Sequence, residues 1–377
     1  RIADEARNSV MEKFNAKKIM ESTLALYEDA SSGMNILIIK VGALGDAILI
    51  IPSVRAIREK FPQAKIKLLT GEENRDVFIN SPLVDEIIVC DFKGRDKGLG
   101  GILRIAKRLR MESFDMVIDF QNNKKSHLLS FLSCAPKRYG YDNGKLGFLL
   151  NKKVKDTKPS IGPIEHQLGI LGLLGICDVD KNFALWPSRE DEEWADNFLE
   201  SYWLKNDMRL VAVNIGSSPR WVTKLWPVKN YIEVCDKLTK KFGIQVVLIG
   251  SEKNDPRSEE FLRRTKCKPI NALGKTNIPR LACLIKRCSL LVSSDSAPIH
   301  IAASAGTPFV AFFGPTDPRR HLPPADNCIV FKKELKCSPC YHTYCAREYA
   351  CMVSIKPGEV YEGILKLLGI KDINPKS

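Results

Sequence analysis

The chain has 377 residues, about twice the length of a typical domain, so its length predicts two domains. Hydrophobic residues make up 44% of it and charged residues 27%, which excludes a largely disordered or collagen-like chain. With 58 Lys and Arg against 44 Asp and Glu, the formal net charge is +14. This charge favours an anionic partner, such as a nucleotide phosphate, a nucleic acid or an acidic lipid surface.

The sequence contains no run of 18 apolar residues, which excludes an ordinary transmembrane helix. The first 33 residues contain neither the apolar segment nor the cleavage site of a signal peptide. We therefore expect a cytoplasmic protein. In that compartment its twelve cysteines are expected to be buried thiols or metal ligands rather than disulfides.

Residues 1–33 predict an amphipathic helix that ends at Ser31–Gly33, and we interpret it as an N-terminal extension. From residue 34 to 185, short apolar segments alternate with helical stretches, as in a parallel sheet covered by helices. The predicted strands of this first domain are Asn35–Val41, Ala64–Leu69, Glu86–Val89 and Met116–Phe120.

The same alternation restarts near Trp186, so we expect a second domain over residues 186–377. Its predicted strands are Leu210–Ile215, Gln245–Gly250, Leu290–Ser293 and Phe309–Phe313, with helices over Tyr231–Phe242 and Ile278–Lys286. The sequence thus predicts an α/β protein of two Rossmann-like, doubly wound domains that face each other across a cleft. Such sheets bind ligands at the carboxyl ends of their strands.

A glycine turn, G-A-L-G-D at residues 42–46, follows the first predicted strand and precedes a predicted helix over Ala47–Lys60. Glycines such as Gly45 allow a ligand to approach the backbone closely. Asp46 is then either an N-cap of the helix or a carboxylate in the cleft that acts as a general base.

A second motif, S-D-S-A-P-I-H-I-A-A-S-A-G-T-P at residues 294–308, predicts one short helix that Ser296 caps and Gly306 ends. The free amides at Ser296 and Ala297 suit a diphosphate. Asp295 and His300 lie on either side of the cap, and His300 is either a ligand contact or a buried histidine. The turn F-G-P-T-D-P, with Gly314 and Thr316, closes over the same site.

A third motif runs from the strand end at Asn214 through Ser217 and Ser218 to K-L-W-P at residues 224–227. The two hydroxyls and Lys224 offer hydrogen-bond donors and a cation to phosphates. The alternative is a polar surface loop anchored by a buried Trp226.

Taken together, the order and spacing of these motifs over residues 34–365 resemble glycosyltransferase family 9, the ADP-heptose:lipopolysaccharide heptosyltransferases. The stretch F-D-M-V-I-D-F-Q at residues 114–121, followed by a R-x-G turn at Arg138, is similar to the same family. The resemblance implies a GT-B fold and an inverting transfer that requires no metal cofactor. It implies a nucleotide-sugar donor, ADP-heptose, and an anionic glycolipid acceptor, the lipopolysaccharide core.

The resemblance also implies roles for particular residues. Asp46 matches the catalytic base, and Lys224 matches the lysine that neutralises the leaving diphosphate. The donor-binding set comprises Ser217, Ser218, Glu252, Asp295, Ser296, Ala297, His300, Gly314 and Thr316, in which Glu252 is expected to hold the ribose hydroxyls. The residues expected to bind the acceptor are Gly45, Lys124 and Arg138.

Four cysteines, Cys337, Cys340, Cys345 and Cys351, form a C-x2-C-x4-C-x5-C array. Thiolates at such spacing suit a structural zinc or iron ion, and free or partly buried thiols are the alternative.

Basic and apolar residues alternate at helical spacing over Ile102–Met111. This helix is either a solvated surface or a peripheral contact with the anionic inner membrane.

Two other functions stay open at this point. One is a GT-B transferase that uses another sugar nucleotide or glycosylates a protein. The other is a metal-stabilised binder of anionic ligands or nucleic acid. The spread of charge over both domains and the aromatic content of 8% argue against nucleic acid as a partner.

Overall fold

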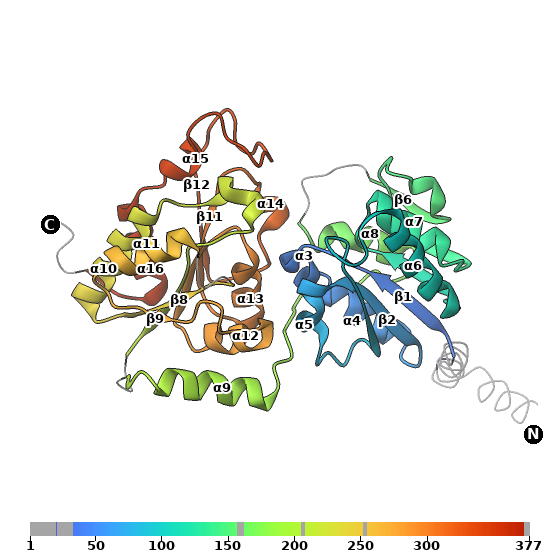
Figure 1. The fold of residues 1–377 in the computed structure, drawn as a ribbon, viewed down its shortest axis with the longest axis horizontal. Coiled ribbons are helices and arrows are strands. Elements are labelled where there is room, and N and C mark those ends of the chain that lie inside the picture. The colour runs from blue at the N-terminus through green and yellow to red at the C-terminus, as the bar shows by residue number, and fades with distance from the viewer. Residues whose placement is uncertain (1–19, 21–32, 157–161, 205–207, 252–254, 373–377) are drawn as a thin grey trace, which may run out of the picture.

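The computed structural model describes residue 20 and residues 33–156, 162–204, 208–251 and 255–372. The predicted helix over residues 1–33 lies outside the described residues, except for Met20 and Gly33. The described chain forms two α/β lobes side by side (Figure 1). None of the helices in these ranges has the length and apolar character that a membrane span requires.

The N-terminal lobe is built on a six-stranded parallel sheet with the strand order β3-β2-β1-β4-β5-β6. Its strands are β1 (Asn35–Ile39), β2 (Lys65–Gly71), β3 (Glu86–Cys90), β4 (Met116–Asp119), β5 (Lys137–Asp142) and β6 (Lys152–Lys155). Its helices are α3 (Leu44–Leu49), α4 (Ile51–Lys60), α5 (Arg75–Phe78), α6 (Gly98–Met111), α7 (Lys124–Leu132) and α8 (Glu165–Gly172), with short 3-10 turns η1 (Glu72–Asn74) and η2 (Gly147–Leu149).

The C-terminal lobe repeats this topology with the order β12-β11-β10-β7-β8-β9, again all parallel. Its strands are β7 (Leu210–Asn214), β8 (Gln245–Ile249), β9 (Ile270–Asn271), β10 (Leu290–Ser294), β11 (Phe309–Phe313) and β12 (Cys328–Lys332). Its helices are α9 (Arg189–Glu200), α10 (Val228–Phe242), α11 (Pro256–Arg264), α12 (Ile278–Lys286), α13 (Ala297–Ala305), α14 (Pro318–His321), α15 (Ala350–Val353) and α16 (Pro357–Leu368), with η3 (Pro219–Lys224).

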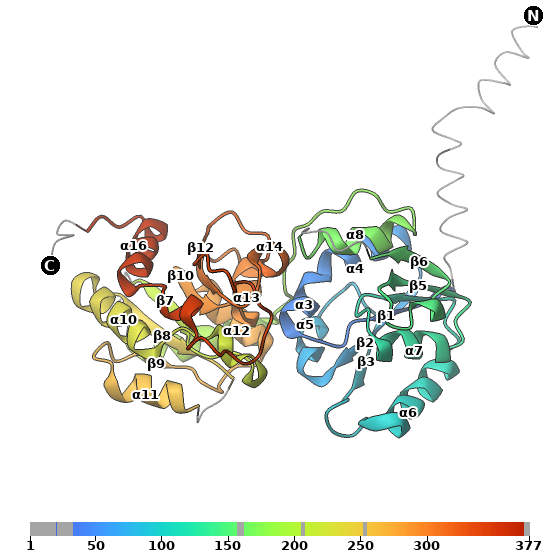
Figure 2. The same cartoon turned by 90° about the horizontal axis from the view of Figure 1, so that it is seen from above.

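Alternation of side chains along the strands explains why each sheet is covered on both faces. In β1, Ile36 and Ile38 pack with α3, α4 and α8, whereas Leu37 and Ile39 pack with α6 and α7. Figure 2 shows α4 and α8 on one side of this sheet and α6 on the other. The two doubly wound domains that the sequence predicts are therefore confirmed.

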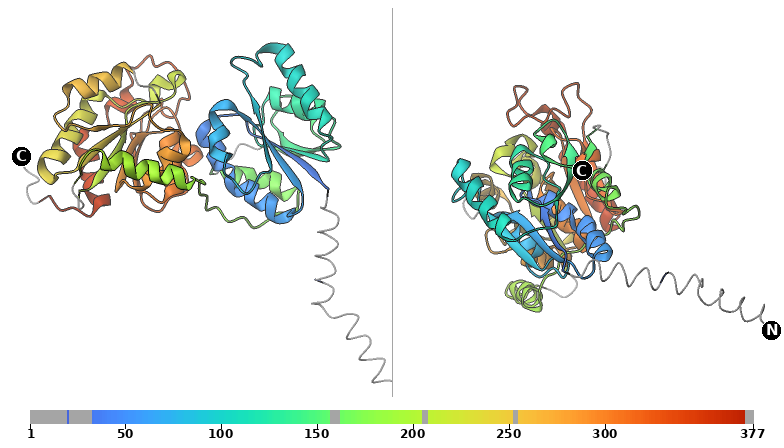
Figure 3. Two further views of the ribbon diagram at one scale, coloured as in Figure 1. Left: turned by 60° about the horizontal axis from the view of Figure 1, so that its bottom comes forward. Right: turned by 90° about the vertical axis from the view of Figure 1, so that its right-hand side faces the viewer.

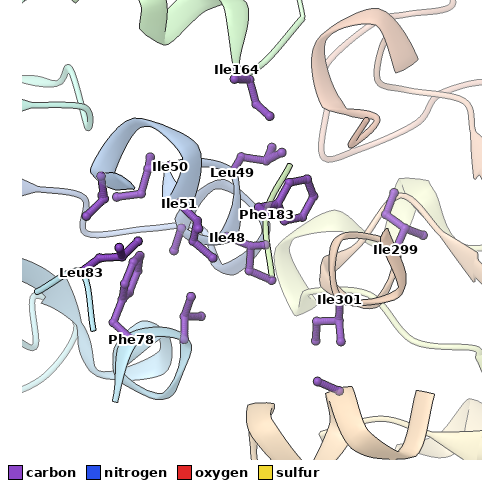
Figure 4. Packing of buried hydrophobic residues seen from close by; sticks show 14 of the residues in the cluster. Ile48, Leu49, Ile50, Ile51, Phe78, Leu83, Ile164, Phe183, Ile299 and Ile301 are labelled. Carbon is purple, nitrogen blue, oxygen red and sulfur yellow. The ribbon is translucent and has the colours of Figure 1, made fainter. Parts of the chain in front are cut away.

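Direct packing of α3 against α13 joins the two lobes, and the left view of Figure 3 shows these parts of the lobes side by side. Figure 4 shows Ile48 of α3 and Phe183, from the segment between α8 and α9, facing the helix α13, which carries Ile299 and Ile301. All four side chains are buried in one hydrophobic cluster that extends across both lobes.

Several details of the sequence prediction were wrong. The single helix predicted over Ala47–Lys60 is two helices. Helix α3 ends at Leu49, and Pro52 lies in the first turn of α4, where its missing N–H is tolerated. The R-x-G turn at Arg138 is part of strand β5. The strands β6 and β9 escaped prediction because β6 is rich in lysine and β9 has two residues, so neither has a run of apolar residues. The strand β12 was missed although its first four residues are apolar.

Candidate functional site

The carboxyl edges of the two sheets face each other at the points where their strand order reverses. In each sheet this point lies between the first and fourth strands, β1 and β4 in one lobe and β7 and β10 in the other. Ligands of doubly wound sheets bind at such switch points. The loops after these four strands therefore carry the candidate site.

The glycine turn after β1 is held by a side chain from the loop after β4. The backbone N–H groups of Val41 and Gly42 both donate to Oε1 of Gln121, each at 2.9 Å. On the other side, Nδ2 of Asn74 donates to the carbonyl oxygen of Val41 at 2.6 Å. These bonds fix the turn from which α3 starts.

Asp46 lies in the first turn of α3 with its side chain half exposed. The N-cap of α3 is Ala43 and not Asp46, so the capping alternative for Asp46 was wrong. Nζ of the buried Lys40 lies 3.6 Å from Oδ2 of Asp46. Burial opposes ionisation of Asp46, but the charge of Lys40, with smaller effects of His300 and His321, outweighs it and lowers the pKa of this carboxyl. Asp46 is therefore ionised at neutral pH.

Two histidines of the C-terminal lobe face Asp46. His300 on α13 is 5% exposed, and its Nδ1 has no hydrogen-bond partner among the described residues. Burial lowers the pKa of His300 to about 4 and also lowers the pKa of His321. Both rings are therefore neutral at pH 7, and Lys40 is the main charge that lowers the pKa of Asp46.

An ion pair between Lys224 and Asp295 lies at the N-terminus of α13. Nζ of Lys224 lies 2.6 Å from Oδ2 of Asp295, and the hydroxyl of Thr316 donates to the same oxygen at 2.6 Å. The amides at Ser296 and Ala297 are among those that have no partner within a helix. The motifs around residues 224, 295 and 316, distant in the sequence, thus meet at one point.

The cap of α13 differs in detail from the prediction. Ser296 is the N-cap residue and Gly306 ends the helix in the left-handed conformation, as predicted, but the Ser296 side chain makes no capping bond. Its hydroxyl instead donates to the carbonyl of Ser294 and accepts from Nδ2 of Asn214. The side chain therefore braces the β7 and β10 loops.

The remaining residues of the predicted donor set lie in different surroundings. The hydroxyl of Ser217 donates to the carbonyl of Trp221 within its own loop, and Ser218 is exposed. Gly314 lies against Cys351 and Met352, where a Cβ atom would come within 2.7 Å of each sulfur. Glu252 lies outside the described residues.

A cavity of about 280 Å³ opens between the lobes beside Asp46. The residues that line it from the N-terminal lobe include Lys40, Gln121, Asn122, Tyr141 and His166, and those from the C-terminal lobe are Arg320 and His321. The ring of Tyr141 stacks on that of His166, with centroids 4.3 Å apart. The cavity presents polar and cationic groups to a ligand next to an ionised carboxylate.

The residues predicted to bind an acceptor do not line this cavity. Gly45 lies against the His300 ring. The guanidinium of Arg138 donates to the carbonyls of Ala135 and Leu149, and Lys124 is the exposed first residue of α7.

Apart from Asp46, the residues that line the cavity were missed by sequence reasoning. Gln121 directly follows a predicted strand, and Arg320 and His321 follow the F-G-P-T-D-P turn, so their positions at strand ends were a usable signal. Nothing in the sequence around His166 marks it.

The four cysteines of the array are not gathered into a metal-binding group in the described structure, and a bound metal stays a prediction. Among the residues that the structure describes, no three His, Cys, Asp or Glu side chains are grouped so that they could hold a metal ion. Sγ of Cys345 accepts the N–H groups of Arg347 and Tyr349, and Cys351 packs on Gly314. The loop instead supports the site, since Ser338 donates to the Gly314 carbonyl at 2.6 Å and Thr223 donates to the His342 carbonyl at 2.9 Å.

Known structures define the class of protein that this architecture represents. The fold is similar to a family 9 glycosyltransferase from Veillonella parvula, with a TM-score of 0.80 and 25% identity over 89% of this chain and 98% of the other. It is also similar to Escherichia coli ADP-heptose lps heptosyltransferase II, with a TM-score of 0.70 and 24% identity over 89% and 98% of the two chains. The protein is thus a glycosyltransferase with the GT-B fold.

Sequence comparison narrows this class to a family. Residues 102–350, more than half of the chain, match the model of glycosyltransferase family 9 (heptosyltransferase). Lipopolysaccharide heptosyltransferase 3 of Escherichia coli K12 is 28% identical over 306 residues, which cover 76% of this chain and 84% of that protein. The chain belongs to glycosyltransferase family 9, the heptosyltransferase family, as its motifs predict.

Proposed function

We propose that this enzyme transfers heptose from ADP-heptose to the lipopolysaccharide core or a closely related anionic glycolipid, with inversion at the anomeric carbon. The names of its relatives supply the donor and the acceptor class. The observation that carries the proposal is the position of Asp46. Its ionised carboxylate lies at a cavity that both lobes line, across from the ion pair at α13.

In the proposed reaction, Asp46 takes the proton of an acceptor hydroxyl that occupies the cavity. The freed oxygen forms a bond to the anomeric carbon of the donor from the face opposite the leaving group. The bond between that carbon and the diphosphate oxygen breaks, and its electron pair leaves with ADP. Lys40 keeps Asp46 ionised for this step.

The donor diphosphate is proposed to lie at the N-terminus of α13. Lys224 and the amides at Ser296 and Ala297 would stabilise the negative charge that develops on it. Asp295, which also accepts a hydrogen bond from Thr316, holds Lys224 in place. We assign donor binding to the C-terminal domain, residues 186–377, and acceptor binding to the N-terminal domain, residues 34–185.

A panel of sugar nucleotides tests the proposal. Purified enzyme is incubated with ADP-heptose, or with other ADP-, UDP- and GDP-sugars, and with core-truncated lipopolysaccharide or a protein acceptor. We expect release of ADP that depends on the lipopolysaccharide, together with an increase in acceptor mass by one heptose. Efficient turnover of a UDP- or GDP-sugar would show that the proposed donor is wrong. Transfer to the protein alone would show that the proposed acceptor is wrong.

A further inference from the structure

The excess positive charge is not spread evenly over both domains, as the sequence reasoning assumed, because most of it lies in one part of the N-terminal lobe. Residues 97–155 contain thirteen Lys and Arg against four Asp and Glu, so this stretch carries +9 of the total of +14. All four acids are engaged within the lobe. Glu112 pairs with Lys67, Asp115 accepts the N–H of Asn35, Asp119 is buried beside His127, and Asp142 pairs with Lys153. The basic side chains are therefore little neutralised.

The outer face of α6 combines this charge with exposed aliphatic side chains. Leu99, Leu103, Lys107 and Met111 are spaced by four residues, so they form one stripe along the helix. The three apolar members are 67%, 53% and 76% exposed. The inner face of the same helix, with Ile105 and Leu109, is buried against the sheet.

Basic side chains lie in and beside this stripe, and two of them make no ion pair with a described residue. Arg104 pairs with Asp96 and Arg108 with Glu86, but Lys107 and Arg110 make no ion pair with any described residue. No acidic residue occurs between Gly98 and Met111. Figure 2 shows α6 on the outside of its lobe, away from the contact with the C-terminal lobe.

From these observations we propose that the outer face of α6 docks on the surface of an anionic phospholipid bilayer. Lys107 and Arg110 would meet the headgroups, and Leu99, Leu103 and Met111 would enter the boundary between headgroups and acyl chains. Nucleic acid is the poorer match, because aliphatic side chains offer no ring on which bases can stack. The proposal rests on the proposed function for its purpose, since a lipid-linked acceptor lies at such a surface.

Vesicle co-sedimentation tests the docking surface without any substrate. The full chain is mixed with vesicles of phosphatidylcholine alone or of phosphatidylcholine with phosphatidylglycerol, at low and high salt. We expect binding to the anionic vesicles only, weakened by salt. The double variant Lys107→Gln/Arg110→Gln should lower the partition coefficient about 25-fold, roughly fivefold for each charge. Leu99→Ser/Leu103→Ser should weaken binding at high salt as well.

Helix α10 provides the matched control, because it also carries exposed lysines but intersperses them with Glu233 and Asp236. The double variant Lys229→Gln/Lys240→Gln removes the same charge there and should bind vesicles as the wild type does. Equal loss in both double variants, equal binding to neutral vesicles, or tight binding to RNA with none to vesicles would each overturn the proposal.

Transfer activity separates this proposal from the proposed function. The α6 variants should keep wild-type turnover on a lipid-free core oligosaccharide. If wild type binds anionic vesicles but turns over no ADP-heptose, docking stands and the proposed substrates fail.

Discussion

The backbone of Gly45 lies against the imidazole ring of His300, so close that a Cβ atom at residue 45 would be 2.6 Å from both Cδ2 and Nε2 of the ring. Gly45 belongs to α3 in the N-terminal lobe and His300 to α13 in the C-terminal lobe. The ring is almost fully buried, so it cannot swing aside as the end of a flexible side chain could. The glycine is therefore required for the close approach of the two lobes.

Gly45→Ala should accordingly weaken catalysis without unfolding either lobe. The added methyl group pushes α3 and α13 apart and moves Asp46 away from the donor site, and a displacement of about 1 Å costs on the order of 100-fold in rate. We expect a fall of that size in kcat/KM for transfer. The control is Gly172→Ala in α8, where a Cβ atom meets nothing within 4 Å. Near wild-type kinetics for Gly45→Ala would show that the lobes do not need this contact.

The buried state of His300 makes stability depend on pH. Its pKa is about 4 in the folded protein, against about 6.5 in an unfolded chain, so between these values the unfolded state binds more protons. Stability due to this group is present above pH 6.5 and decreases as the pH falls. From the two pKa values, the free energy of unfolding should decrease by about 2 kcal/mol between pH 7.5 and pH 5.

Urea unfolding of wild type and His300→Gln at these two pH values measures the effect. The variant should lose less free energy of unfolding on acidification than the wild type does, because the substituted side chain does not titrate. His321, whose pKa is also lowered, remains in both proteins. An identical pH dependence of the two proteins would contradict the burial of a neutral His300.

The match between predicted and observed elements shows which structural features a local sequence pattern can predict. Periodicity and glycine turns locate strands such as Leu290–Ser294 and helices such as α12, because these patterns report local burial and local backbone geometry. Contacts between the lobes depend on how two sheets are placed in space, which no local pattern encodes. For that reason the contact of Gly45 with His300 could not be predicted, whereas its role in acceptor binding stays a prediction. The cysteine spacing likewise indicated ligands but could not show where each sulfur points.

If Asp46 is the general base, Lys40 determines how far the pH can fall before transfer activity is lost. The pKa of Asp46 is lowered although burial opposes this, because Nζ of Lys40 lies 3.6 Å from its carboxylate, with His300 and His321 on the other side. Lys40→Met removes the cation and should raise this pKa, so activity that needs the ionised carboxylate is lost at higher pH. As the pH falls from neutral, Lys40→Met should therefore lose kcat/KM at a higher pH than the wild type does. Lys40→Arg should restore the wild-type profile, and a profile unchanged by Lys40→Met would argue against control of Asp46 by this charge.

If Lys224 stabilises the leaving diphosphate as proposed, its pair with Asp295 combines a catalytic and a structural role, which a double-mutant cycle can separate. Lys224→Ala should weaken donor binding and turnover together, but it also leaves the buried Asp295 carboxylate with Thr316 as its remaining side-chain partner. An unpaired buried charge of this kind costs about 3 kcal/mol of folding free energy. Adding Asp295→Asn removes the charge, so the double variant should recover most of the stability while transfer stays low. Chemical denaturation and donor titration of the two single variants and the double variant give both quantities. If the double variant regains transfer as well as stability, Lys224 acts only as the partner of Asp295 and its assignment to the diphosphate is wrong.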